Sequence, residues 1–145
     1  MTIRDTLKWV DSHRSDVPTL TPQGLADLLT QAPEEITLID IRELQERLLR
    51  GAIPGGHSAP RGMLEFWADP NCDYFRDFFR EDTHLVVYCA GGARSVLAAR
   101  SLMEMGYRHV SHLDEGFAGW TRAGFEVEDV SASSKWVQRD DGLSV

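Results

Sequence analysis

The stretch from Leu85 to Leu102 combines a predicted strand, a cysteine, a glycine-rich turn and a predicted helix. The strand-forming residues Leu85 to Tyr88 lead into Cys89; two glycines and Arg94 follow, and a helical pattern continues to Leu102. Unbroken apolar strands separated by helices are typical of a parallel sheet that is covered on both faces. The stretch therefore favours an α/β fold and places Cys89 at a turn.

Other segments repeat this alternation of strand and helix. Ile36 to Asp40 is a second apolar run with β-branched residues, and residues 107–114 contain a weaker third strand. Helices are predicted over residues 3–14, 21–32, 43–49, parts of 63–79, 95–105 and 117–123, with Thr21 as an N-cap and Gly106 and Gly124 as stops. We predict an α/β, three-layer domain with a central, mainly parallel sheet flanked by helices.

The length of 145 residues is that of one domain with a single core. Residues 1–18 are expected to form an amphipathic helical extension, residues 19–127 the main domain and residues 128–145 a tail, in which periodicity is lost. The apolar positions of the extension either dock on the domain, which is the stronger expectation, or support a homodimer; they are Ile3, Leu7, Trp9 and Val10.

Composition and charge exclude several classes of partner. A net charge of -8 and a pI near 5.0 repel phosphate backbones, so nucleic acid is not an expected ligand. No apolar run approaches the ~18–20 residues that span a bilayer, and the N-terminus lacks a secretory signal pattern. We therefore expect a cytoplasmic protein without a membrane partner, in which Cys72 and Cys89 are free thiols.

Cys89 stands where a nucleophile is expected, because ligands of parallel sheets bind beyond the carboxyl ends of the strands. The small residues after it allow backbone N–H groups to turn inward around one centre, and the predicted helix adds its positive end at Arg94 and Ser95. Such an environment favours a thiolate. The alternative is a buried structural cysteine, which has no use for a glycine-lined turn. The candidate anion-binding residues are Ala90, Gly91, Gly92, Ala93, Arg94 and Ser95.

Four motifs in order resemble the single-domain rhodaneses, a family of sulfurtransferases. Residues 40–46 resemble D-x-R-E-x-x-E, residues 51–56 resemble G-H-I-P-G-A, residues 89–94 resemble C-x-x-G-x-R, and residues 113–120 resemble L-x-G-G-x-x-x-W. In the second motif Ala52 replaces the histidine, and in the last motif Glu115 replaces the first glycine. If Glu115 takes a positive φ, its turn is strained.

The resemblance implies a two-step transfer of sulfane sulfur. The Cys89 thiolate takes the outer sulfur of a donor such as thiosulfate, and the resulting persulfide passes it to a thiophilic acceptor such as cyanide or a thiol. The donor is a small molecule or a protein persulfide, and no cofactor or metal is implied. Arg61 follows the second motif and is a candidate for attracting the sulfonate end of the donor, with a solvated loop role as its alternative.

Two other functions stay open from the sequence. A phosphatase or arsenate reductase uses a related C-x5-R loop, but residues 89–94 are one residue shorter, which favours a sulfur atom over a phosphoryl group. A non-catalytic interaction module is the second alternative, and the presence of both Cys89 and Arg94 argues against it. Cys72 is interpreted as incidental, with a sulfur-relay thiol as the alternative. His109 and His112 point to opposite faces of a strand, so no metal site is expected.

Overall fold

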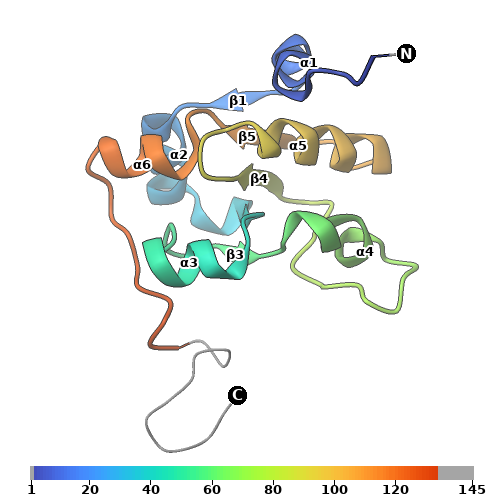
Figure 1. Ribbon diagram of the computed structural model, residues 1–145. Coiled ribbons are helices and arrows are strands. Elements are labelled where there is room, and N and C mark those ends of the chain that lie inside the picture. The colour runs from blue at the N-terminus through green and yellow to red at the C-terminus, as the bar shows by residue number, and fades with distance from the viewer. Residues whose placement is uncertain (1, 134–145) are drawn as a thin grey trace, which may run out of the picture.

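Five parallel strands form the centre of the computed structural model, which describes residues 2–133 (Figure 1). The α/β prediction with a mainly parallel sheet is therefore confirmed. Strand β4 lies in the middle of the sheet, so Cys89 leaves the sheet at its centre. In spatial order the strands are β1 (Thr19–Leu20), β5 (Val110–Leu113), β4 (His84–Tyr88), β2 (Ile36–Asp40) and β3 (His57–Ser58).

The helices follow the predicted order with shifted ends. They are α1 (Thr6–Ser12), α2 (Pro22–Gln31), α3 (Leu44–Arg50), α4 (Leu64–Ala68), α5 (Arg94–Met105) and α6 (Gly116–Arg122). Helix α2 begins as predicted, because the Thr21 side chain accepts a hydrogen bond from the Gly24 N–H. Helix α1 begins later than predicted, because Asp5 caps it at the Lys8 N–H. None of the described helices is long and apolar enough to cross a membrane.

The segment predicted to be partly helical over residues 63–79 forms α4 alone, after a short 3-10 turn at Arg61–Met63. Beyond Ala68 the chain turns instead, and the Asp69 side chain accepts a hydrogen bond from the Asn71 N–H. The ring of Pro70 removes a backbone donor there, which opposes helix continuation.

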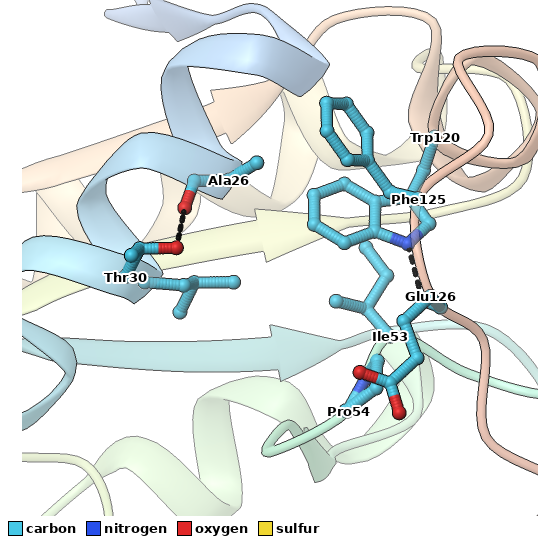
Figure 2. A pocket seen from close by; sticks show the side chains of 8 residues that line it. Ala26, Thr30, Ile53, Pro54, Trp120, Phe125 and Glu126 are labelled. Atoms are coloured by element: carbon cyan, nitrogen blue, oxygen red, sulfur yellow. Dashed lines mark hydrogen bonds between the residues drawn. The ribbon is translucent and has the colours of Figure 1, made fainter.

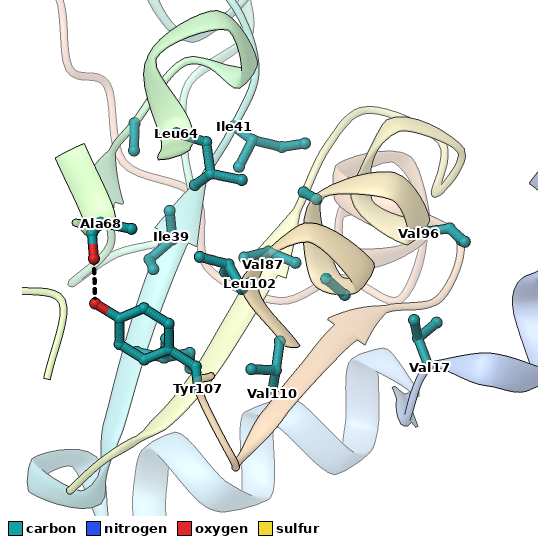
Figure 3. Packing of buried hydrophobic residues seen from close by; sticks show 14 of the residues in the cluster. Val17, Ile39, Ile41, Leu64, Ala68, Val87, Val96, Leu102, Tyr107 and Val110 are labelled. Carbon is teal, nitrogen blue, oxygen red and sulfur yellow. Dashed lines mark hydrogen bonds between the residues drawn. The ribbon is translucent and has the colours of Figure 1, made fainter. Parts of the chain in front are cut away.

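Side chains of β4 alternate between two cores, one on each face of the sheet. Leu85, Val87 and Cys89 face the core that α1, α4 and α5 cover, and Figure 3 shows the packing of this core around Val87. Val86 and Tyr88 face the core that α2 and α6 cover. The period of two along a strand therefore produces the predicted three layers.

The N-terminal segment shares its core with the rest of the chain. Val10 and Val17 are buried in the same cluster as residues of α5, and Trp9 packs against that cluster. Two of the four apolar positions considered for a dimer are therefore used internally, while Ile3 and Leu7 remain exposed. Most of the predicted C-terminal tail, residues 134–145, lies outside the described residues.

Candidate active site

Cys89 follows β4 directly and lies against the first turn of α5. Its side chain is buried, and its Sγ accepts a hydrogen bond from the Gly92 N–H at 3.2 Å. The Oγ of Ser95 lies 3.5 Å from the same sulfur. Both groups can donate to a negatively charged sulfur, and the positive end of the 12-residue helix α5 adds a favourable field. Two polar groups and the N-terminus of α5 therefore surround the sulfur of Cys89.

Helix α6 contacts the loop that begins at Cys89 through two backbone hydrogen bonds. The N–H groups of Phe117 and Ala118 donate to the carbonyl oxygens of Cys89 and Ala90, at 2.8 and 3.0 Å. Gly116 makes this approach possible, since a Cβ there would lie 2.6 Å from the Cys89 oxygen. Glu115 adopts φ 60°, so the residue that departs from the family glycine does take the left-handed conformation.

The N-terminal segment reaches the same loop from the other side. Arg14 donates from Nη1 to the carbonyl oxygen of Gly92 at 2.9 Å, and its Nε donates to Asp11 at 2.8 Å. Gly92 has φ +94°, which turns its N–H toward the Cys89 sulfur while its carbonyl faces Arg14. The sequence gives no local signal for this contact, because the two residues are 78 positions apart.

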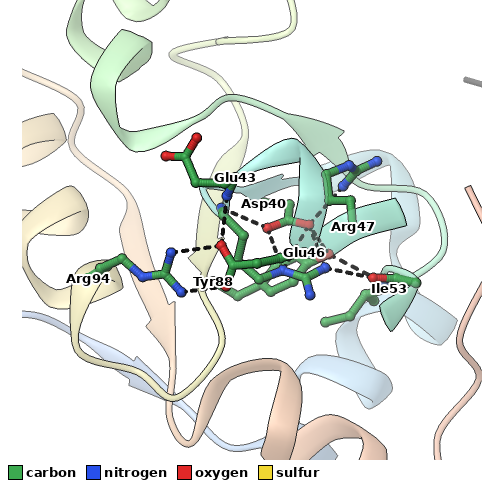
Figure 4. Close-up of polar contacts among 9 residues, drawn as sticks. Asp40, Glu43, Glu46, Arg47, Ile53, Tyr88 and Arg94 are labelled. Carbon is green, nitrogen blue, oxygen red and sulfur yellow. Dashed lines mark hydrogen bonds and ion pairs between the residues drawn. The ribbon is translucent and has the colours of Figure 1, made fainter. Parts of the chain in front are cut away.

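The Arg94 side chain forms an ion pair with Glu46. Its two terminal nitrogens lie 2.9 Å from the two carboxylate oxygens of Glu46 on α3 (Figure 4). Hydrogen bonding from Arg94 lowers the pKa of Glu46 to about 2. The Arg94 charge, which the sequence predicts to bind an anion, is thus balanced by Glu46, a partner that the sequence does not identify.

Asp40 and Arg42 form a buried cluster with Arg47 and Tyr88. Asp40 accepts hydrogen bonds from Arg42, Arg47 and the Tyr88 hydroxyl, at 2.8, 2.8 and 3.0 Å (Figure 4). Burial raises the pKa of Tyr88, so this hydroxyl stays a donor. The cluster ties the carboxyl ends of β2 and β4 to α3, and it thereby fixes the helix that carries Glu46.

Ser95 connects the sulfur to a buried histidine. Its Oγ lies 3.0 Å from Nδ1 of His112 on β5, and the His112 side chain is buried. Burial lowers the pKa of His112, which favours the neutral ring. His109, outside the strand, is exposed. The sequence does not predict this position of His112 behind the cysteine loop, because the contact depends on how β5 is placed beside β4.

A pocket of about 560 Å³ opens beside the loop, between α3 and α6. Ala90 belongs to its wall, so the pocket reaches the residue after Cys89. Its lining is mixed: it includes the exposed Leu49, the aromatic ring of Phe117 and the charged side chains of Arg50 and Glu46. A smaller pocket of about 240 Å³ lies between α2 and Trp120, whose Nε1 donates to the Glu126 carbonyl oxygen (Figure 2).

Arg61 is engaged away from the cysteine. Its Nη1 lies 3.0 and 2.9 Å from the two carboxylate oxygens of Glu65, and its backbone N–H donates to the Ile41 oxygen. Among the described residues, no polar contact joins Arg61 to the loop that carries Cys89. Both cysteines are free thiols, and Cys72 is half-buried in the turn segment after α4.

The fold and the loop define a class: α/β proteins with a buried cysteine at the carboxyl edge of a parallel sheet. Residues 21–123 match the rhodanese-like domain family. A sulfurtransferase from Allochromatium vinosum is 31% identical over 105 residues, which cover 72% of this chain and 85% of that protein. The chain belongs to the rhodanese-like domain family.

Solved structures give the same fold. A protein of unknown function from Rhodopseudomonas palustris, described as a possible tyrosine phosphatase, has a TM-score of 0.83 and 40% identity and covers 88% of this chain and 98% of its own. The thiosulfate sulfurtransferase from Pseudomonas aeruginosa has a TM-score of 0.69 and 28% identity, with 85% of this chain matched to 22% of that protein. These similarities agree with the resemblance that the four motifs carry.

Proposed function

We propose that the protein is a sulfurtransferase that moves a sulfane sulfur through a persulfide on Cys89. The observation that carries the proposal is the pair of groups aimed at one buried sulfur: the Gly92 N–H at 3.2 Å and the Ser95 Oγ at 3.5 Å. The same donors that stabilise a thiolate also stabilise the sulfur of a persulfide anion. Relatives named sulfurtransferase support the same reaction class.

The reaction has two balanced steps. In the first, the Cys89 thiolate attacks the outer sulfur of thiosulfate, a new S–S bond forms, and sulfite leaves with the electron pair of the broken S–S bond. In the second, cyanide or a thiolate attacks the terminal sulfur of the persulfide. Thiocyanate or a new persulfide is released, and the electron pair returns to Cys89 as the thiolate.

The pocket beside Ala90 supports an acceptor larger than cyanide. Its volume of about 560 Å³ is in the range of small-molecule sites, and its wall combines Leu49 and Phe117 with charged residues. An acceptor thiol seated there approaches the loop from the side on which Ala90 lies. We propose this pocket as the acceptor's entry to Cys89, for a small thiol or a thiol on a protein.

A phosphatase is the second candidate, because a structure at 40% identity is described as a possible tyrosine phosphatase. Two observations favour sulfur chemistry instead. The loop from Cys89 to Arg94 has six residues, one fewer than a C-x5-R phosphate cradle, and Arg94 is paired with Glu46. An arginine that must clamp a phosphate with both prongs would first have to leave that carboxylate.

The test is to incubate the reduced wild-type protein and its Cys89→Ser and Cys72→Ser variants with thiosulfate and to record intact masses. Cyanide is then added and thiocyanate is measured. We expect the wild-type protein and Cys72→Ser to gain one sulfur that cyanide removes, and Cys89→Ser to gain none. Cys72→Ser serves as the matched control for a thiol outside the loop.

A parallel assay with p-nitrophenyl phosphate separates the two candidates. Cyanide-labile sulfur on Cys89 without phosphate release supports the sulfurtransferase. Phosphate release that depends on Cys89, without any sulfur uptake from thiosulfate or a persulfide donor, replaces it with the phosphatase. If neither reaction occurs, the enzyme proposal fails and the interaction module takes its place.

A further inference from the structure

Three buried side chains form a continuous line from the nucleophile into the sheet. Cys89 Sγ lies 3.5 Å from Ser95 Oγ, and Ser95 Oγ lies 3.0 Å from His112 Nδ1. All three side chains are buried, with exposed fractions of 1%, 0% and 1%. The line runs from the end of β4 through the first turn of α5 to β5, so three separate elements build it.

A hydroxyl group has one proton to donate, so when Ser95 donates in one of these two hydrogen bonds it must accept in the other. When Cys89 is a thiol, its S–H donates to Ser95 Oγ, and the Ser95 hydroxyl donates to an unprotonated Nδ1 of His112. When Cys89 is a thiolate, the Ser95 hydroxyl donates to sulfur, and its oxygen is free to accept from an Nδ1–H. The ring of His112 serves both arrangements, because Nδ1 is an acceptor in one tautomer and a donor in the other.

We propose that His112 is a positioning residue which, through Ser95, sets the protonation state of the Cys89 sulfur. On ionisation the proton of Sγ passes to Ser95 Oγ, and the hydroxyl proton passes to Nδ1. The ring then releases the proton on Nε2 to solvent, so the net change is the loss of one proton from Cys89 and the His112 ring ends neutral. The inference rests on the proposed function only in taking Cys89 as the nucleophile.

The charged groups around Cys89, Ser95 and His112 favour a neutral His112 ring. Burial is the main cause that lowers the pKa of His112; Arg14 lowers it further, while Asp114 opposes both. Arg94 is the cation that faces Cys89, and it is paired with Glu46. A lasting imidazolium beside Arg14 is therefore unfavourable, whereas a neutral ring that carries its proton on Nδ1 retains the hydrogen bond to Ser95.

The experiment follows alkylation of Cys89 by iodoacetamide as a function of pH, with the Cys89 peptide quantified by mass spectrometry. No sulfur donor is present, so failure of the sulfurtransferase proposal does not affect the result. We expect His112→Leu to move the pH midpoint of alkylation upward by about one unit, which is about tenfold less thiolate near neutral pH. His112→Asn should restore most of the wild-type profile, because a side-chain amide can present either N–H or C=O to Ser95.

The remaining variants make the outcome decisive. Ser95→Ala should raise the pH midpoint of alkylation as His112→Leu does. The double variant should raise it no further, because both substitutions interrupt the same chain of hydrogen bonds from Cys89 to His112. His109→Gln, an exposed histidine next to β5, is the matched control and should follow the wild type. The proposal is overturned if folded His112→Leu matches the wild-type profile, if Asn and Leu shift it equally, or if the effects of Ser95→Ala and His112→Leu add.

Discussion

Glu46 and Arg94 meet in a two-pronged ion pair, with both nitrogen–oxygen distances at 2.9 Å. The pair joins α3 to the start of α5 and sits beside the loop that carries Cys89. Both side chains are partly exposed. In such a setting the carboxylate neutralises the arginine without removing it from water, so the field at the loop depends on Glu46 as much as on Arg94.

Glu46→Gln should therefore strengthen binding of an anionic donor. Removing one negative charge a few ångströms from the site changes the interaction by roughly 1 kcal/mol in water, which lowers the KM for thiosulfate about fivefold at low ionic strength. The effect should shrink as salt is added. Glu104→Gln removes the same charge from a pair at the other end of α5 and is the control. An unchanged KM at low salt would show that Arg94 takes no part in donor binding.

The two glycines of the loop should respond differently to alanine. Gly92 has φ +94°, and a Cβ there would lie 3.3 Å from the Glu115 nitrogen, whereas a Cβ at Gly91 meets nothing within 4 Å. We expect Gly92→Ala to lower the free energy of unfolding by about 1–3 kcal/mol and to slow sulfur transfer, because the N–H that faces sulfur moves. Urea denaturation tests this, and Gly91→Ala should stay within about 0.5 kcal/mol of wild type. Equal losses for both variants would contradict the assignment.

Replacing the residue that departs from the family pattern should stabilise the protein. Glu115 adopts φ 60°, a conformation that costs a residue with a side chain about 1–2 kcal/mol. Its ion pair with Arg122, at 3.4 Å between exposed side chains, offsets little of this. Glu115→Gly should raise the melting temperature, with a gain of about 1 kcal/mol. Arg122→Gln removes only the ion pair, and a Tm for Glu115→Gly at or below that of the wild type would refute the prediction.

The stability of the protein should fall as acid protonates the histidine at the far end of β4. Burial, together with the nearby His109, lowers the pKa of His84 from 6.5 to about 4. Because the folded state resists protonation, the stabilising contribution is complete above pH 6.5 and is lost as the pH falls toward about 4. Unfolding in urea across this range should show a smaller acid loss for His84→Gln than for the wild type. The Gln side chain can still bond to Ser111, whose Oγ lies 2.7 Å from His84.

Features of the fold that depend on neighbouring residues in the chain can be predicted from the sequence. The apolar run that ends at Cys89 forms β4, the Thr21 cap begins α2, and Gly106 ends α5 in the left-handed conformation. Each of these depends on residues within one turn or one strand. The α/β class follows from their alternation, and the position of Cys89 at the carboxyl edge follows from the class.

The partners of the site residues could not be predicted in the same way. Arg94 and Glu46 are 48 positions apart, and Ser95 and His112 are 17 apart on different elements. These contacts arise from the sheet order, which places β5 and β2 on either side of β4. A single sequence shows that Arg94 is charged and that His112 lies on a strand, but not which carboxylate or hydroxyl each one meets.

Residues 10–17, which precede the family match, are part of the folded domain. The similarity to rhodanese-like domains begins at residue 21, yet Val10 and Val17 belong to the core and Arg14 holds the Gly92 carbonyl. A fragment cut at the start of the similarity would keep every motif residue and lose the hydrogen bond from Arg14 to the loop that carries Cys89. The folded unit of this protein therefore begins at or before Val10, whereas the part that it shares with the family begins at residue 21.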